Sequence, residues 1–282
     1  MTLTAIADPN SANIVLTAVN NKTEAIADNH DTITLMAHVT DAENNPLIKQ
    51  SVFWSSTHNV LSENMVKTDD NGNVQIVIKG TEAQPTTVTA TLENSQSATT
   101  NLRFIAGQVN TSQSTFLIEP QSIIANGQSL ATGTINLKDK FGNPVPKQNK
   151  FITLSGDNNT IKFSALKEIN TGIYQTTISG KQEGISLIRA QYTNASNTFN
   201  LTQPLGFIAD KQNAIINEVN VIAPFDVTAN GKDKVVIRAK IVDKQGNSNM
   251  EGVAVGWLTS LGKLSLPISK TDKKWDCRNY LK

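Results

Sequence analysis

The sequence is poor in the residues that most often carry catalysis, cross-links or ligand binding. Its 282 residues include one cysteine, so no disulfide can form within the chain and any core must be held by apolar packing. Aromatic residues make up 5% and histidines number three. The 25 basic and 24 acidic residues give a net charge of +1, which excludes bulk electrostatic attraction to nucleic acid or to an anionic membrane surface.

Long apolar runs are also absent. No stretch approaches the twenty apolar residues that a membrane-spanning helix needs, and the residues after Met1 form neither the basic nor the apolar part of a signal peptide. The chain as written is therefore expected neither to export itself nor to insert into a membrane.

No catalytic, phosphate-binding or metal-binding motif occurs, so we expect no enzyme, no cofactor and no catalytic, cofactor-binding or metal site. His30, His38 and His58 have no acidic partners at metal-ligand spacing and are interpreted as surface residues. The pair Asp69 and Asp70 lacks the surrounding oxygen ligands of a calcium loop and is interpreted as turn-forming.

What the sequence does contain is an internal repeat. The tripeptides Ala27-Asp28-Asn29, Ala125-Asn126-Gly127 and Ala229-Asn230-Gly231 each precede a turn that begins with Asp41, Asp139 or Asp243. The leading Ala and the turn Asp are 14 residues apart in all three copies, and the copies are 98 and 104 residues apart. This regularity predicts three modules of about 100 residues, each the size of one β-sandwich domain.

The predicted boundaries are a tail of a preceding repeat or linker at 1–9, repeats at 10–107 and 108–209, and an incomplete repeat at 210–282. Ala5-Ile6-Ala7-Asp8 resembles 104–107 and 207–210, where one repeat ends and the next begins. An acid at these junctions, Asp8 or Asp210, is a minor candidate for a calcium ligand that would stiffen the chain.

Alternation of apolar and polar residues predicts strands. Ile33, Leu35, Ala37 and Val39 share one face of a strand over 31–39, and Val235, Ile237, Ala239 and Ile241 take the same places 202 residues later. About seven strands are expected in each full repeat. Trp54 and Trp257 are predicted to fill the centre of their sandwiches, and the turns at 67–72 and 168–172 are predicted to close hairpins.

The last nine residues do not fit the repeat. Where an Asn-Gly turn and an alternating strand are expected, the chain reads Lys274-Trp275-Asp276-Cys277 and continues to Lys282. Removing one A from the A-rich codons of the preceding lysines restores a Gly at position 275. We therefore hypothesise a frameshifted tail at 274–282, a disrupted gene and a third repeat that lacks its last three strands; the alternative is a divergent C-terminus.

The tripeptide 125–127, the turns 139–144 and 243–247, and the Thr-Asp-x-x-Gly turn at 68–72 resemble the bacterial immunoglobulin-like (Big-1) repeats of the invasin/intimin family of outer-membrane adhesins. The likeness extends over residues 10 to 273, with departures at Asn29, Asn44 and Ser248. It implies an all-β protein of tandem immunoglobulin-like β-sandwich domains, two complete and a third truncated.

The resemblance also implies a location at the cell surface or outer membrane and a role in cell adhesion. We expect a non-enzymatic spacer or stalk segment whose partners are the adjacent repeats of the same adhesin. The alternative is a repeat face that directly binds a host cell-surface protein or a neighbouring adhesin copy. An inhibitor or chaperone-like sandwich is supported by the fold class alone.

Overall fold

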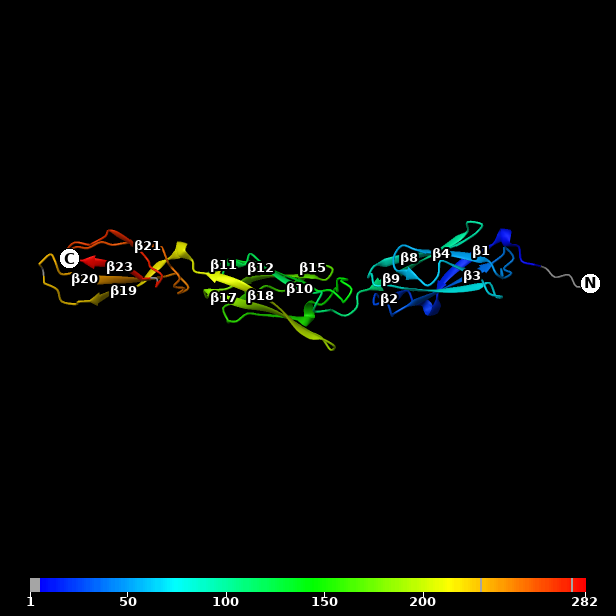
Figure 1. The fold of residues 1–282 in the computed structure, drawn as a ribbon, viewed down its shortest axis with the longest axis horizontal. Coiled ribbons are helices and arrows are strands. Elements are labelled where there is room, and N and C mark those ends of the chain that lie inside the picture. Colours follow the sequence, from blue (N-terminus) through cyan, green and yellow to red (C-terminus); the bar gives the residue numbers. More distant parts are fainter. Residues whose placement is uncertain (1–5, 229, 275) are drawn as a thin grey trace, which may run out of the picture. The chain divides into compact units, whose positions relative to one another are not determined.

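The structure, a computed structural model, describes residues 6–228, 230–274 and 276–282. Almost all of its regular structure is β-strand (Figure 1). Four short 3-10 turns interrupt the strands, at Pro9–Ser11, Val19–Asn21, Asn149–Phe151 and Lys211–Asn213. The predicted all-β immunoglobulin-like class is confirmed.

Two sheets enclose the core of the first repeat. One has the order β1 (Asn13–Ala18), β3 (Ile33–Thr40), β7 (Asn73–Lys79) and β5 (Val60–Leu61). The other has the order β2 (Glu24–Ile26), β9 (Ser97–Ile105), β8 (Pro85–Leu92), β4 (Ser51–Ser56) and β6 (Met65–Lys67). Neighbouring strands are antiparallel except β2 and β9, which are parallel.

The second repeat has the same plan. Its first sheet has the order β10 (Thr115–Glu119), β12 (Ala131–Asn136), β16 (Ile173–Ser179) and β14 (Lys162–Phe163), with β15 (Lys167–Asn170) also on β16. Its other sheet has the order β11 (Ser122–Ile124), β18 (Thr198–Ile208), β17 (Gly184–Thr193) and β13 (Ile152–Ser155). The short strand β11 is parallel to β18, as β2 is to β9.

The third repeat carries fewer strands. One sheet has the order β19 (Ile215–Ala223), β20 (Val235–Val242) and β23 (Asp276–Leu281), and the other consists of β21 (Ala254–Gly256) and β22 (Ile268–Lys270). In register, β23 lies on β20 as β7 lies on β3, because Val235 faces Leu281 as Ile33 faces Ile78. Within the described residues, no strand takes the places of β8 and β9.

The chain divides into two compact units, which do not follow the predicted repeat boundaries. One consists of Met1–Ser114 and Leu137–Pro146, and the other of Thr115–Asn136 and Lys147–Lys282. The segment Leu137–Pro146 belongs by sequence to the second repeat, yet it is grouped with Met1–Ser114, which contains the first repeat and the start of the second. The division into three repeats stays a prediction, and this segment marks where the repeats are joined.

The predicted core face is confirmed in the first repeat, where Ile33, Leu35, Ala37 and Val39 are all fully buried and Trp54 is 5% exposed. In the third repeat, Ala239 and Ile241 are buried, whereas Val235 and Ile237 are only half-buried. The difference arises because a sheet of two short strands opposes β20, where a sheet of five opposes β3.

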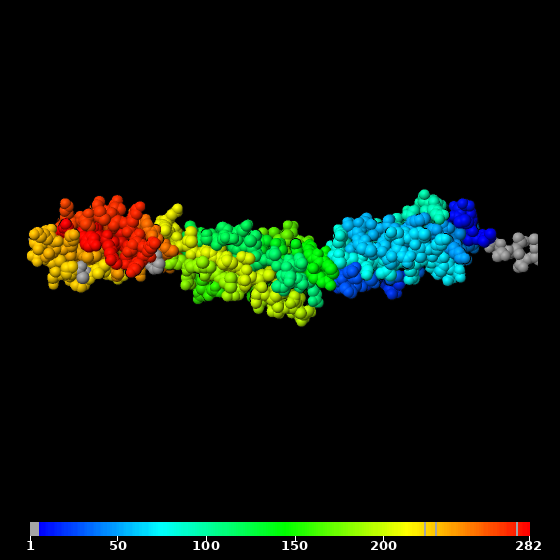
Figure 2. All heavy atoms as spheres, viewed as in Figure 1, coloured from blue at the N-terminus to red at the C-terminus, as the bar shows by residue number. Residues whose placement is uncertain are grey.

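Three expectations need correction. The third repeat does not stop at Lys273, because 276–281 form β23 with Cys277 and Asn279 facing inward, fully buried; it lacks two strands, where three were expected. The C-terminal segment is red in Figure 2, where part of it is visible at the surface. Trp275 lies outside the described residues, and the frameshift stays a prediction.

The other two corrections concern Trp257 and a hairpin. Trp257 is half-buried and lies just beyond β21, with its Nε1 donating to Ser269 Oγ at 2.8 Å; it packs against the small core of the third repeat. The turn at 67–72 closes no hairpin, because β6 pairs with β4 in the opposite sheet, whereas the turn at 168–172 does connect the paired strands β15 and β16.

Candidate functional site

The repeated Asp turn is the site that recurs in all three repeats. Asp41, Asp139 and Asp243 are buried, at 5%, 2% and 1% exposure. In each, Oδ1 accepts hydrogen bonds from the backbone N–H groups two and four residues further on, at 2.8 to 3.0 Å. The residue three positions on has positive φ: Asn44 at 64°, Gly142 at 89° and Gly246 at 88°.

The second carboxylate oxygen binds the segment that leads into the repeat. Asp139 Oδ2 accepts from Gly107 N at 3.0 Å, and Asp243 Oδ2 accepts from Asp210 N at 3.0 Å. Asp41 Oδ2 accepts from Asp8 N at 3.2 Å in the same way. One carboxylate therefore closes the turn and also holds the connecting chain, because an ionised carboxylate offers several acceptor sites.

An asparagine four residues after the Asp reaches the preceding repeat. Asn143 Oδ1 accepts from Ala83 N at 2.9 Å, and its Nδ2 donates to Thr81 O at 2.8 Å. These three residues lie in one compact unit. A side-chain amide suits this place because it carries both an acceptor and donors, which match one backbone N–H and one backbone C=O.

The second junction repeats the arrangement in the other unit. Asn247 Oδ1 accepts from Glu183 N at 2.9 Å, and its Nδ2 lies within hydrogen-bonding distance of Lys181 O at 3.0 Å and Ala125 O at 3.2 Å. Asn247 is 6% exposed. It also donates to Asp243 Oδ2 at 2.9 Å, so Asp and Asn act together at the junction.

The two junctions differ in the residue that follows this asparagine. Pro144 follows Asn143 and has no N–H, whereas Ser248 follows Asn247 and donates its N–H to Glu183 Oε1 at 3.0 Å. The Glu183 carboxylate also accepts from Asn249 N at 3.0 Å. The second junction thus carries a charge-assisted contact that the first cannot form.

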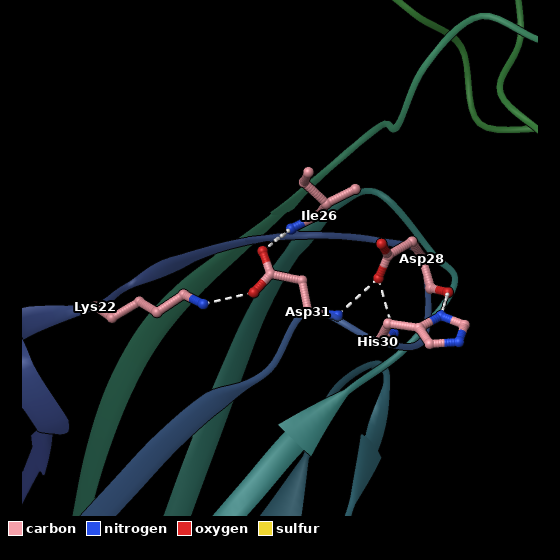
Figure 3. A network of polar contacts seen from close by, with 5 residues as sticks. All are labelled: Lys22, Ile26, Asp28, His30 and Asp31. Carbon is pink, nitrogen blue, oxygen red and sulfur yellow. Dashed lines mark hydrogen bonds and ion pairs between the residues drawn. The ribbon is translucent and has the colours of Figure 1, made fainter.

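The tripeptide at the start of each repeat is a second recurrent turn. Asp28 Oδ1 accepts from His30 N and Asp31 N, both at 2.7 Å (Figure 3). Asn126 and Asn230 make the corresponding two bonds with their Oδ1 atoms at 2.8 to 2.9 Å. Ala229 lies outside the described residues. In the first repeat Asp31 is further bound by Lys22 Nζ at 2.5 Å and Ile26 N at 2.9 Å.

Hydrogen bonding sets the charge state of the junction carboxylates. The side-chain amide of Asn45, together with backbone N–H groups, lowers the pKa of Asp41 below its ordinary value. Burial acts to raise the pKa of Asp243, but bonds from Asp210 N and Asn247 outweigh it and the pKa is lowered. Both groups are therefore ionised at neutral pH, the form that accepts hydrogen bonds on both oxygens.

The other candidates from the sequence are surface or turn residues. His30, His38 and His58 are all exposed, as predicted. Asp69 Oδ1 accepts from Asn71 N at 2.9 Å and Asn73 N at 2.8 Å, which confirms the turn-forming interpretation. Among the described residues, no three His, Cys, Asp or Glu side chains are grouped as metal ligands.

Asp8 and Asp210, the two minor candidates for calcium ligands at the junctions, each have a carboxylate oxygen hydrogen-bonded within the protein. Asp8 Oδ1 accepts from Asn10 N at 2.9 Å, and Asp210 Oδ2 accepts from Asn213 Nδ2 at 2.8 Å. No helix in the described part of the chain has the length and apolar character needed to cross a membrane.

Asn143, Asn247 and the loops that they bind are not among the site residues predicted from the sequence. A signal was present nonetheless, since Asn follows the Asp at the same interval in all three copies (45, 143 and 247). Turn formation alone requires Asp at the first position and a residue tolerant of positive φ, but no particular side chain at this one.

Comparison with known families identifies both complete repeats. Residues 15–105 match the family described as bacterial Ig-like domain (group 1), and residues 110–210 match invasin, domain 3. The inverse autotransporter adhesin YeeJ of Escherichia coli (strain K12) is 29% identical over 285 residues. The match covers 96% of this chain and 12% of that relative, so the chain spans about an eighth of the curated protein.

Solved structures show the same fold. The chain matches Yersinia pseudotuberculosis InvD with a TM-score of 0.62 and 21% identity, covering 85% of this chain and 72% of that one. It matches FdeC, an Escherichia coli adhesin, with a TM-score of 0.62 and 17% identity, covering 99% and 90%.

Proposed function

Because the chain belongs to the invasin/intimin family of bacterial proteins built from Ig-like (Big-1) repeats, we propose that it is a non-enzymatic spacer segment of a surface adhesin. In this role, successive repeats are fixed to one another so that the chain holds a binding domain at a distance from the cell. The partners of each repeat are then its neighbours in the same adhesin, and the site of action is the bacterial surface.

One observation supports this role above others, namely that the same Asp and Asn positions bond the turn to the linker and to the preceding repeat at two successive junctions. A linker held by one backbone bond swivels about its soft dihedrals. Three bonds from two elements, the linker and the loop, restrict that rotation. Side chains that bond a turn to the linker and to the preceding repeat are expected in a spacer and are not required for a set of independent domains.

The proposal is tested at the second junction by the distance between two spin labels. Cysteines replace the exposed strand residues Lys167 and Lys240 in a chain whose buried Cys277 is changed to Ser. A single narrow distance distribution is expected from double electron–electron resonance. Asn247→Ala should widen it, whereas Asn249→Ala should not, because the exposed Asn249 side chain makes no hydrogen bond within the described residues.

A broad distribution in the unaltered chain would contradict a spacer role. The alternative function, direct binding by a repeat face, is addressed by screening the full chain against host extracellular proteins and against a second copy of itself. One feature favours a search on the first repeat, since Phe53 and Met65 are cross-strand neighbours and are 44% and 47% exposed. A spacer should bind neither target through the first repeat; loss of any observed binding in Phe53→Ser would favour the alternative.

A further inference from the structure

The three equivalent turns differ in what their asparagine contacts. Asn143 and Asn247 are bonded to the loop of a preceding repeat, but Asn45 is exposed. Its Nδ2 lies 3.2 and 3.0 Å from the two carboxylate oxygens of Asp41. Within the described residues its Oδ1 accepts no hydrogen bond, so the part of the amide that serves the other junctions is open.

The loops that occupy the other two turns are bound through the main chain. One is Thr81-Glu82-Ala83, between β7 and β8, and the other is Lys181-Gln182-Glu183, between β16 and β17. They share no residue at any of the three positions, yet in both the asparagine takes the C=O of the first residue and the N–H of the third. The amide therefore recognises backbone geometry and not loop sequence.

The residue after the asparagine narrows the choice of loop. Pro46 follows Asn45, as Pro144 follows Asn143, so neither turn has the N–H that Ser248 offers to the Glu183 carboxylate. The first repeat thus matches the junction whose loop ends in Ala83. A loop with a small, uncharged third residue leaves no carboxylate without a donor at this place.

The connecting chain is already held as at the other junctions. Asp8 N donates to Asp41 Oδ2, as Gly107 N donates to Asp139 Oδ2 and Asp210 N to Asp243 Oδ2. The first turn therefore has its linker contact in place and only its loop contact open.

We propose that Asn45 and Pro46 form a docking surface for the loop between the β7-type and β8-type strands of another Ig-like repeat, joined through residues 6–8. The loop is recognised by the backbone C=O of one residue and the N–H of the residue two positions later, with a small residue at the N–H position. This inference rests on the proposed spacer function, because a spacer requires such successive repeats.

The test joins a copy of residues 10–104 directly to the N-terminal side of Ile6 in the chain. The copied Phe104 then leads into Ile6-Ala7-Asp8, just as the natural Phe104 leads into 105–107. The probe is hydrogen exchange of the copied Ala83 amide, measured by NMR. The natural Ala83 amide, bound by Asn143, is the reference in the same molecule.

The two Ala83 amides should be protected to a similar degree. Asn45→Ala, made in the natural repeat and not in its copy, should speed exchange of the copied Ala83 amide about tenfold or more, as loss of a bond of about 1.4 kcal/mol implies. Exchange of the natural Ala83 amide should not change. Exchange of the copied amide at the rate of an exposed loop, in a copied repeat whose strand amides remain protected, overturns the proposal.

If that copied repeat does not fold, a copy of residues 108–207 that carries Glu183→Ala provides the second version before Ile6, and the amide at copied position 183 is the probe. Its behaviour is read in the same two ways. A narrow spin-label distribution at the second junction combined with an unprotected copied amide would refute the docking surface alone. A broad distribution combined with a protected one would refute the spacer function alone.

Discussion

The prediction that bears most directly on the junctions compares Asn247→Ala with Asn45→Ala. The two asparagines occupy the same place in equivalent turns, but Asn247 is buried, with 6% of its surface exposed, whereas Asn45 lies exposed to solvent. Asn247 lies within bonding distance of Ala125 O, Lys181 O, Asp243 Oδ2 and Glu183 N. Its Nδ2 carries two hydrogens, so its side chain makes at most three full bonds at one time.

The magnitude follows from these counts. A net hydrogen bond is worth roughly 0.5–1.5 kcal/mol, and truncation also leaves the Glu183 N–H and a Lys181 C=O without their partner. Asn247→Ala should therefore lower the stability of the junction by about 2–4 kcal/mol. Asn45→Ala removes contacts to Asp41 that water can replace, so it should cost about 0.5–1 kcal/mol.

The assay is native-state hydrogen exchange followed by NMR, because an array of repeats does not unfold in a single step and a global midpoint would mix them. A difference of about 2 kcal/mol corresponds to roughly a thirtyfold change in exchange rate. In Asn247→Ala the Glu183 amide should lose protection first. Equal losses of stability in Asn247→Ala and Asn45→Ala would refute the assignment of Asn247 to the junction. Unchanged protection of the Glu183 amide in Asn247→Ala would refute it as well.

Three further outcomes are expected. Trp54→Ala should destabilise the first repeat by about 3–5 kcal/mol, because it leaves a cavity between the two sheets. Trp257 is only half-buried, so Trp257→Ala should destabilise the third repeat clearly less. Hydrogen exchange of core amides in each repeat measures both losses of stability, and equal losses would contradict the packing. The pKa of Asp243 is lower in the folded chain than its unfolded value of 3.8, so the stability that this carboxylate contributes is present above that pH and is lost as pH falls through the folded pKa. Protection of the Asp210 amide, which donates to this carboxylate, should therefore decline below about pH 4. Unchanged protection down to pH 2 would be the contrary result. Ile216 and Val219 are 54% and 56% exposed on the sparsely covered third repeat, so changing both to Ser should reduce self-association in sedimentation experiments; an unaltered chain that stays monomeric at high concentration would oppose this.

Much of the fold could be predicted because strand burial leaves a period of two in the sequence. The face formed by Ile33, Leu35, Ala37 and Val39 is a property of alternation, and the positive φ at Asn44, Gly142 and Gly246 is a property of residue type. The constant interval of 14 residues between the leading Ala and the turn Asp, together with the likeness of these residues to Big-1 repeats, was enough to indicate the repeat family.

Pairing partners could not be predicted with the same success. The turns at 67–72 and 168–172 look alike in sequence, yet only the second connects paired strands, because β6 joins β4 in the other sheet. Which sheet an edge strand joins depends on the whole sandwich and not on the turn. The last residues show the same limit, since 276–281 pair with β20 although their inward positions hold Cys277 and Asn279.

The sequence by itself determined the all-β class, the repeat, its core faces and the turns that set strand register, since each of these depends on a residue's own type and on its near neighbours. Only the tertiary structure decided what the turn asparagines bind. Asn45, Asn143 and Asn247 are the same residue at the same place in the repeat, and their surroundings differ through loops that lie about sixty residues away in the chain. A side-chain amide takes whichever backbone groups the fold brings to it, and no local pattern records which those are.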